Sequence, residues 1–239
     1  MNMRFSGKLA LVTGGTGGLG RAVTLAFLAE GAKVVVTYQK QEEFDAVKSA
    51  AGKNGASLEG RRVDVTDEGE VRQFIESILA QHSRLDILVN AVGSFAGGGK
   101  LWELDTKAFD LMMALNVRSG YALARTVAPV MLKQKSGAIV NVASKAALDH
   151  GPGVAAYAAS KAAALALMDS LAAEVKGTGV RVNSVLPSII DTEANRKAMP
   201  NADFTKWPKP EEIARVILFL CSDDAKLIHG AAVPVYGES

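Results

Sequence analysis

The sequence predicts one α/β domain built on a parallel, doubly wound sheet of about seven strands flanked by helices. Short apolar runs rich in β-branched residues alternate with stretches of helical periodicity along all 239 residues, without a linker or repeat. A glycine-rich turn directly follows the first apolar run. Residues of chemical interest follow several later runs, and ligands of such sheets bind at the carboxyl ends of the strands.

The expected elements follow one another in regular order. Apolar runs predict strands at residues 8–13, 33–37, within 57–65, and at 85–90, 138–143, 180–186 and 231–236. Helical spacing of apolar residues predicts helices at residues 21–30, 42–53, 68–82, 105–133, 155–176 and 209–222. Residues 187–208, rich in Pro, Asn, Asp and Trp, are expected to be irregular and to act as a substrate lid.

The composition is that of an ordinary globular protein and argues against several functions. Apolar residues make up 49% and charged residues 22% of the chain, and a net charge of +2 gives no case for nucleic acid or membrane as partner. Cys221 is the one cysteine, so no internal disulfide can form, and its apolar neighbours predict a core position. No signal peptide or spanning segment is recognisable, and we expect a cytoplasmic location.

The loop at residues 14–20 (GGTGGLG) lies between the first strand and the first helix. Glycines allow a ligand to approach the backbone closely, and a helix N-terminus offers free N–H groups to a pyrophosphate. An isolated glycine cluster is usually only a flexible loop, but this position between strand and helix predicts a dinucleotide site.

The residues after the second strand bear on the choice of dinucleotide. An acidic residue there favours NAD, because it binds the adenosine ribose. This chain has Tyr38, Gln39 and Lys40 instead, and Lys40 could meet a 2′-phosphate or could simply be a solvated loop residue. NADP(H) is therefore preferred over NAD(H). Asp64, at the end of the third strand, could accept a hydrogen bond from adenine or cap the next helix.

A hydroxyl, a phenol and an amine recur at set spacings later in the chain. Tyr157 and Lys161 lie four residues apart in a predicted helix and share one face, although such pairs also occur in ordinary helices. The ammonium group can lower the phenol pKa, which makes Tyr157 a candidate general acid or base. Ser144 follows a strand and could hold a substrate oxygen. Asn116 is either structural or orders a water near Lys161.

Together these motifs resemble the short-chain dehydrogenase/reductase family over essentially the whole chain, which implies a Rossmann-type fold. The matching positions are Thr13, Gly14, Gly18 and Gly20 of its TGxxxGxG loop, the adenine-contacting Asp64, Asn90 and Gly93 of its NNAG segment, the tetrad Asn116, Ser144, Tyr157 and Lys161, and Pro187 and Thr192. Ala91, Val92 and Ser188 depart from the family pattern. The resemblance implies cofactor contacts from Thr13, Gly14, Thr16, Gly18, Leu19, Gly20, Tyr38, Gln39, Lys40, Asp64, Val65, Asn90, Ala91, Gly93, Tyr157, Lys161, Pro187, Ile190 and Thr192.

The family's reaction is hydride transfer between a nicotinamide and a carbonyl or alcohol carbon. The resemblance implies that Tyr157 is the general acid/base, that Lys161 lowers its pKa and holds the nicotinamide ribose, and that Ser144 binds the substrate oxygen. Asn116 would hold a water that relays protons to Lys161. No metal is expected, since no cluster of His, Cys and carboxylates suggests one. A non-catalytic nucleotide-binding sensor or scaffold is the alternative, and the complete tetrad argues against it.

The substrate is left open between two classes. The core resembles 3-oxoacyl-ACP reductases, which reduce thioesters, whereas residues 190–207 and the stretches SKAALDHGPG and SFAGGG resemble dihydropteridine reductases. Unlike that second group, this chain has Ser144 and Asn116 and lacks the acidic residue that selects NADH. The expected substrate contacts are Phe95, Ser144, Phe204 and Trp207. The aromatic rings of Phe95, Phe204 and Trp207 favour a compact, ring-bearing carbonyl compound.

The two longest predicted helices bear on assembly. Residues 105–133 and 155–176 carry more apolar and Ala positions than one buried stripe needs. In the family such helices pair across two-fold axes, and closed symmetry is usual for soluble oligomers. We therefore expect a homo-oligomer, a dimer or a tetramer, that acts on a small-molecule carbonyl or alcohol.

Overall fold

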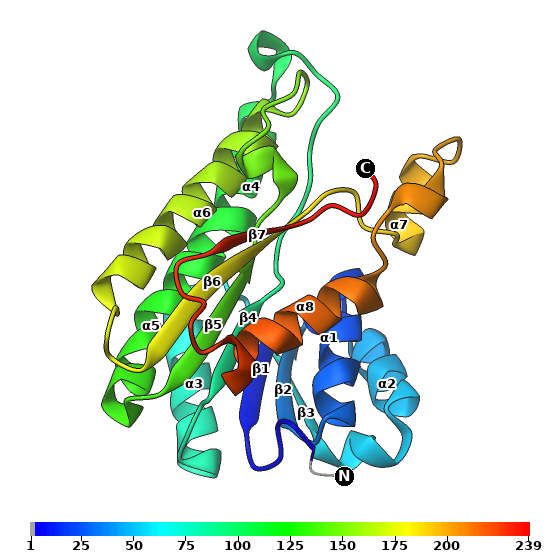
Figure 1. Cartoon of the computed structure of the whole chain (residues 1–239). Coiled ribbons are helices and arrows are strands. Elements are labelled where there is room, and N and C mark those ends of the chain that lie inside the picture. Colours follow the sequence, from blue (N-terminus) through cyan, green and yellow to red (C-terminus); the bar gives the residue numbers. More distant parts are fainter. Residues whose placement is uncertain (1–2) are drawn as a thin grey trace.

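The computed structural model describes residues 3–239 and contains the predicted parallel sheet (Figure 1). Its seven strands lie in the order β3-β2-β1-β4-β5-β6-β7, and every neighbouring pair is parallel. The strands are β1 (Leu9–Thr13), β2 (Lys33–Tyr38), β3 (Leu58–Arg62), β4 (Ile87–Asn90), β5 (Gly137–Val142), β6 (Val180–Pro187) and β7 (Ala232–Val235). The fold class predicted from the sequence is confirmed.

Helices cover both faces of the sheet, as Figure 1 shows. They are α1 (Gly18–Ala29), α2 (Gln41–Ala50), α3 (Glu68–His82), α4 (Thr106–Met113), α5 (Ser119–Gln134), α6 (Ala155–Glu174), α7 (Glu193–Ala198) and α8 (Pro210–Cys221). Buried residues of α1 and α8 pack on one face, and those of α3, α5 and α6 pack on the other. Cys221 ends α8 inside the first of these cores, as predicted, and burial raises its thiol pKa to about 12.

The strand order reverses between β1 and β4, and a buried polar row holds the strands together there. Thr13 pairs with Asn90 in register, and Asn90 pairs with Asn141 of β5. The Thr13 hydroxyl donates to Asn90 Oδ1 at 2.9 Å, and Asn90 Nδ2 donates to Asn141 Oδ1 at 3.1 Å. These bonds lie at the carboxyl ends of the strands, where a doubly wound sheet binds its ligands.

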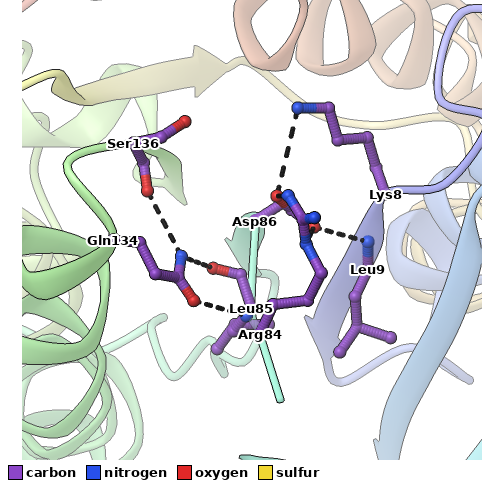
Figure 2. A network of polar contacts seen from close by, with 7 residues as sticks. All are labelled: Lys8, Leu9, Arg84, Leu85, Asp86, Gln134 and Ser136. Carbon is purple, nitrogen blue, oxygen red and sulfur yellow. Dashed lines mark hydrogen bonds and ion pairs between the residues drawn. The ribbon is translucent and has the colours of Figure 1, made fainter. Parts of the chain in front are cut away.

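A second polar network lies at the amino ends of β1 and β4 (Figure 2). The Asp86 carboxylate is only 5% exposed, accepts from the Leu9 backbone N–H at 2.9 Å and pairs with Arg84. The Gln134 amide accepts from the Leu85 N–H at 3.0 Å and donates to the Leu85 carbonyl at 2.9 Å. The end of α5 is thereby tied to the start of β4, away from the candidate site.

Two expected elements end differently in the structure. The strand predicted to end at Asp64 ends at Arg62, and the Asp64 carboxylate instead accepts from the Thr66 N–H at 2.9 Å and closes a turn. The single helix predicted over residues 105–133 is divided into α4 and α5 by a π-helical turn, Ala114–Arg118. That turn carries Asn116, and such insertions are frequent at functional sites.

Residues 187–208 were expected to be irregular, and this expectation was wrong for the segment between β6 and α8 (residues 188–209). It contains the short helix α7, whose first turn is capped by Thr192 accepting from the Asn195 N–H at 3.2 Å. Arg196 donates to Asp191 at 2.8 Å, and its guanidinium lies 4.9 Å from the centroid of the Phe204 ring. These local contacts stabilise a helix of six residues, which is too short to show a periodic apolar pattern.

The unusual residue Ser188 has a structural explanation. Its hydroxyl lies 2.6 Å from both the Tyr236 carbonyl oxygen and the Ser239 hydroxyl. Glycine could not make these bonds. The serine therefore ties the start of the 188–209 segment to the residues that follow β7.

Candidate active site

The glycine-rich loop is folded tightly against the end of β2. Gly14 has a φ of +67°, and its N–H donates to the Thr37 hydroxyl at 2.9 Å. A Cβ on Gly20 would lie 2.0 Å from the Gly14 carbonyl oxygen, so α1 packs directly on the turn. Gly17 precedes α1 without a side-chain cap, which leaves the first N–H groups of the helix available to an anion. These features fit a pyrophosphate.

A groove of about 280 Å³ runs along the carboxyl ends of β1 to β4. Eight residues predicted as cofactor contacts line it: Gly14, Thr16, Tyr38, Gln39, Asp64, Val65, Ala91 and Gly93. The sequence reasoning missed Gly17, Thr37, Glu43, Val63, Val92 and Leu115, which line it as well. The side chain of Lys40 is 64% exposed and pairs with Glu43 at 3.4 Å.

The remaining predicted cofactor residues surround this groove at varying depths. The buried ones are Thr13, Leu19, Gly20, Asn90 and Pro187, whereas Gly18, Ile190 and Thr192 are more exposed. A Cβ on Gly18 would lie 2.7 Å from the Thr192 methyl group. The 188–209 segment therefore lies against the start of α1. Asp64 does not cap α3, because Asp67 accepts from the Glu70 N–H there.

Strand β5 and helix α6 bring Ser144, Tyr157 and Lys161 together. Ser144 lies beyond the end of β5 in extended conformation, and its hydroxyl accepts from the Ala146 N–H at 3.1 Å. Tyr157 stands in the first turn of α6 and Lys161 one turn later. The Lys161 ammonium group is 5.9 Å from the centroid of the Tyr157 ring and donates to the Val142 carbonyl at 3.0 Å.

The groove and this cluster are continuous. A Cβ on Gly93, which lines the groove, would lie 3.0 Å from Lys161 Nζ and 2.9 Å from Asn116 Oδ1. A side chain at position 93 would therefore fill the space between the groove and the cluster. A ligand that lies along the groove can reach Lys161 and Tyr157.

Burial dominates the proton affinities in the cluster. It raises the pKa of Tyr157, and a hydrogen bond with Ser144 opposes this rise. It lowers the pKa of Lys161 to about 8. The Lys161 ammonium group donates its hydrogen bond to the Val142 carbonyl rather than to the phenol. The phenol is therefore protonated near neutral pH.

Asn116 holds the loop after β4 against α6. Its Oδ1 accepts from the Ser94 N–H at 2.9 Å, and its Nδ2 donates to the Ser94 carbonyl at 3.0 Å and to the Ser160 hydroxyl at 2.9 Å. Ser160 in turn donates to the Tyr157 carbonyl at 2.8 Å. Protein groups therefore engage both ends of the Asn116 amide.

The expected substrate residues occupy different environments. The Phe95 ring is 63% exposed and meets the Tyr157 ring edge-on, with centroids 5.0 Å apart. Trp207 is only 6% exposed and packs against Phe204, so it anchors the 188–209 segment to the body. Phe204 lies between Trp207 and the Arg196 guanidinium. Of the aromatic candidates, Phe95 is the one in contact with the cluster.

The buried lysine makes a testable contribution to stability. Between pH 8 and the unfolded pKa of about 10.4, the unfolded chain binds more protons than the folded chain, so stability rises with pH. Lys161→Met should remove this rise. From pH 8 to 9.5, the unfolding free energy of wild type should therefore increase by about 2 kcal/mol relative to that of the variant. Urea denaturation without added dinucleotide measures it. Parallel pH profiles for the two proteins would contradict the assignment.

Across residues 3–239, no three His, Cys, Asp or Glu side chains are grouped as ligands for a metal ion. None of the helices in that range combines the length and the apolar character needed to cross a membrane.

Known proteins resemble this chain along nearly its whole length. A family model described as short chain dehydrogenase matches residues 8–203. A 3-oxoacyl-[acyl-carrier-protein] reductase, FabG of Thermotoga maritima, is 34% identical over 98% of each chain.

Solved structures of other proteins are also similar to this chain along nearly its whole length. One described as ElxO with NADP bound has a TM-score of 0.91 and 29% identity, and covers 96% of this chain and 97% of its own. An NAD+-bound xylitol dehydrogenase has a TM-score of 0.90 and 25% identity, and covers 98% of this chain and 99% of its own. The resemblance read from the sequence is confirmed, and the chain belongs to the short chain dehydrogenase family of oxidoreductases.

Proposed function

We propose that the protein is an NAD(P)H-dependent oxidoreductase that interconverts a carbonyl compound and its alcohol, with Tyr157 as general acid/base. The observation that carries the proposal is the continuity of the glycine-lined groove with the cluster of Ser144, Tyr157 and Lys161 through Gly93. The bound dinucleotide would supply the hydride, and the protein supplies orientation and a proton.

Each residue of the cluster has a separate task in this proposal. Ser144 donates a hydrogen bond to the substrate oxygen and stabilises its developing negative charge. Tyr157 donates its proton to that oxygen during reduction, and the raised pKa keeps the phenol protonated and ready to act as an acid. Lys161 holds the ribose next to the nicotinamide and places a positive charge near the phenol. Asn116 keeps the loop after β4 in position.

For the cofactor, the proposal favours NADPH over NADH. Lys40 supplies a positive charge beside the groove, and Tyr38, Gln39 and Lys40 include no carboxylate. NADP and NAD both occur in the structures of relatives. We also propose that the 188–209 segment closes over the bound ligands as a lid, since Thr192 adjoins the start of α1.

For the substrate, the proposal favours a compact, ring-bearing carbonyl compound. Phe95 stands edge-on beside Tyr157 and leaves much of its ring exposed, so a planar substrate can stack on it. The second candidate is a 3-oxoacyl thioester, which is favoured by the likeness to the Thermotoga maritima reductase.

One experiment separates these candidates. NADPH oxidation is followed with a 3-oxoacyl thioester, a quinone, a simple ketone and quinonoid dihydropterin under the same conditions. Turnover of a ring substrate at a rate that Phe95→Ala lowers would support a ring-bearing substrate. Turnover of the thioester alone would rule it out. Dinucleotide binding without turnover of any compound would point to the sensor or scaffold.

We also propose that the chain assembles as a dimer or tetramer through α5 and α6. A groove between these helices is lined mainly by apolar side chains, and Tyr121 and Leu132 lie exposed on it. Light scattering at micromolar concentration should give a mass two or four times that of the chain. A monomer would contradict the proposal, and Leu132→Glu should shift an oligomer towards smaller species.

A further inference from the structure

A carboxylate that the sequence reasoning did not consider lies in the cofactor groove. Glu43, in the first turn of α2, lines the groove together with Thr16, Tyr38 and Gln39. Its Oε2 accepts from the Thr16 hydroxyl at 3.1 Å, and its Oε1 lies 3.4 Å from Lys40 Nζ. The carboxylate therefore bridges the glycine-rich loop and the residues after β2.

The position of this carboxylate is fixed by packing. The neighbouring residue, Phe44, is buried and stacks on Tyr38 with ring centroids 5.0 Å apart. The Tyr38 hydroxyl donates to Gln41 Oε1 at 2.6 Å, which ties the start of α2 to the end of β2. Glu43 consequently faces the groove, whereas Glu42 beside it is exposed and does not line it.

The location matters because dinucleotide folds bind the adenosine ribose between the glycine-rich loop and the end of the second strand. A carboxylate there accepts hydrogen bonds from ribose hydroxyls and repels a 2′-phosphate. Glu43 also compensates the charge of Lys40, the group expected to attract that phosphate. Repulsion of the 2′-phosphate and compensation of Lys40 thus act in the same direction, against NADP(H).

We propose that Glu43 is a specificity-determining residue that restrains the preference for NADPH over NADH. The inference rests on the proposed use of a nicotinamide dinucleotide. Glu43 takes over the role of the carboxylate that is absent from positions 38–40, and it does so from α2 rather than from the end of β2. NADPH binding requires Lys40 to leave Glu43 and to turn towards the 2′-phosphate.

The test measures equilibrium binding, without turnover. NADPH and NADH are titrated by fluorescence into wild type, Glu43→Gln and the matched control Glu42→Gln, which removes the same charge from the same turn of α2. Glu43→Gln should tighten NADPH about tenfold, which corresponds to about 1.4 kcal/mol, and should leave NADH unchanged or up to about threefold weaker. Glu42→Gln should change the ratio of the two affinities by less than about twofold.

Two additions make the outcome specific. Titration with adenosine 2′,5′-bisphosphate and with 5′-AMP isolates the 2′-phosphate, and only the bisphosphate should bind more tightly to Glu43→Gln. Lys40→Gln should weaken NADPH more in the Glu43→Gln background than in wild type, because Glu43 then no longer compensates Lys40.

The possible failures are distinguishable. If wild type binds both dinucleotides and Glu43→Gln leaves their affinity ratio unchanged, the role of Glu43 is refuted while the proposed function stands. If wild type binds neither dinucleotide, the proposed function itself fails and this inference fails with it. Thermal melting of each variant verifies that the fold is retained.

Discussion

Tyr157→Phe is expected to reduce kcat about a hundredfold or more, while the affinity for the dinucleotide stays close to that of wild type. The substitution removes the hydroxyl that we propose delivers the proton, and it keeps the ring that packs against Phe95. Steady-state kinetics on a compound that the wild-type protein reduces measure the loss. Fluorescence titration with NADPH measures what is retained.

Tyr121→Phe is the matched control for this variant. Tyr121 lies on α5, and its hydroxyl accepts from Arg125 at 3.1 Å, away from Ser144 and Lys161. The control should turn over substrate at the wild-type rate. A Tyr157→Phe protein with near-wild-type kcat would mean that another group supplies the proton.

Among single Gly→Ala substitutions in the glycine-rich loop, Gly20→Ala is expected to give the largest loss of stability. The added Cβ would stand 2.0 Å from the Gly14 carbonyl oxygen, a backbone atom that cannot rotate away. Either α1 shifts from the sheet or the loop opens, and overpacking of this kind costs about 3 kcal/mol or more. Urea denaturation should show the loss, and dinucleotide binding should disappear with the loop geometry.

Gly17→Ala provides the comparison within the same loop. Its Cβ would come no closer than 3.5 Å to the same Gly14 oxygen, an ordinary contact. Its φ of −71° also suits any residue. The unfolding free energy of this variant should stay within about 0.5 kcal/mol of wild type. Equal losses for both variants would show that the close approach of Gly20 does not control stability.

The fold was largely predictable because its determinants are local. The apolar runs that became β1, β2, β4, β5 and β6 are buried on both sides, so the β-branched residues alone identify them. The glycine-rich loop was recognisable for the same reason, since it stands directly between a strand and a helix. The helix α7 was missed because its six residues are too few to show a periodic apolar pattern.

The site was predictable only in part because several features arise from distant segments. Glu43 reaches the groove through the stacking of Phe44 on Tyr38, a contact that no local pattern reveals. The pKa of Tyr157 depends on how deeply the phenol is buried and on its hydrogen bond with Ser144, whereas the Lys161 ammonium group is directed to the Val142 carbonyl. Spacing in the sequence places two side chains on one helix face, but it does not give the direction of a lysine's terminal amine.

The rate at which the Cys221 thiol is labelled can report opening of the core around α8. The thiol lies in the core at the end of α8, and a pKa of about 12 keeps it out of the reactive thiolate form at neutral pH. Because the sequence contains no other cysteine and Cys221 is only 7% exposed, its labelling by a thiol reagent should be faster when α8 separates from the sheet. The rate of labelling therefore counts openings of this core, and ligands that slow it bind to the closed form.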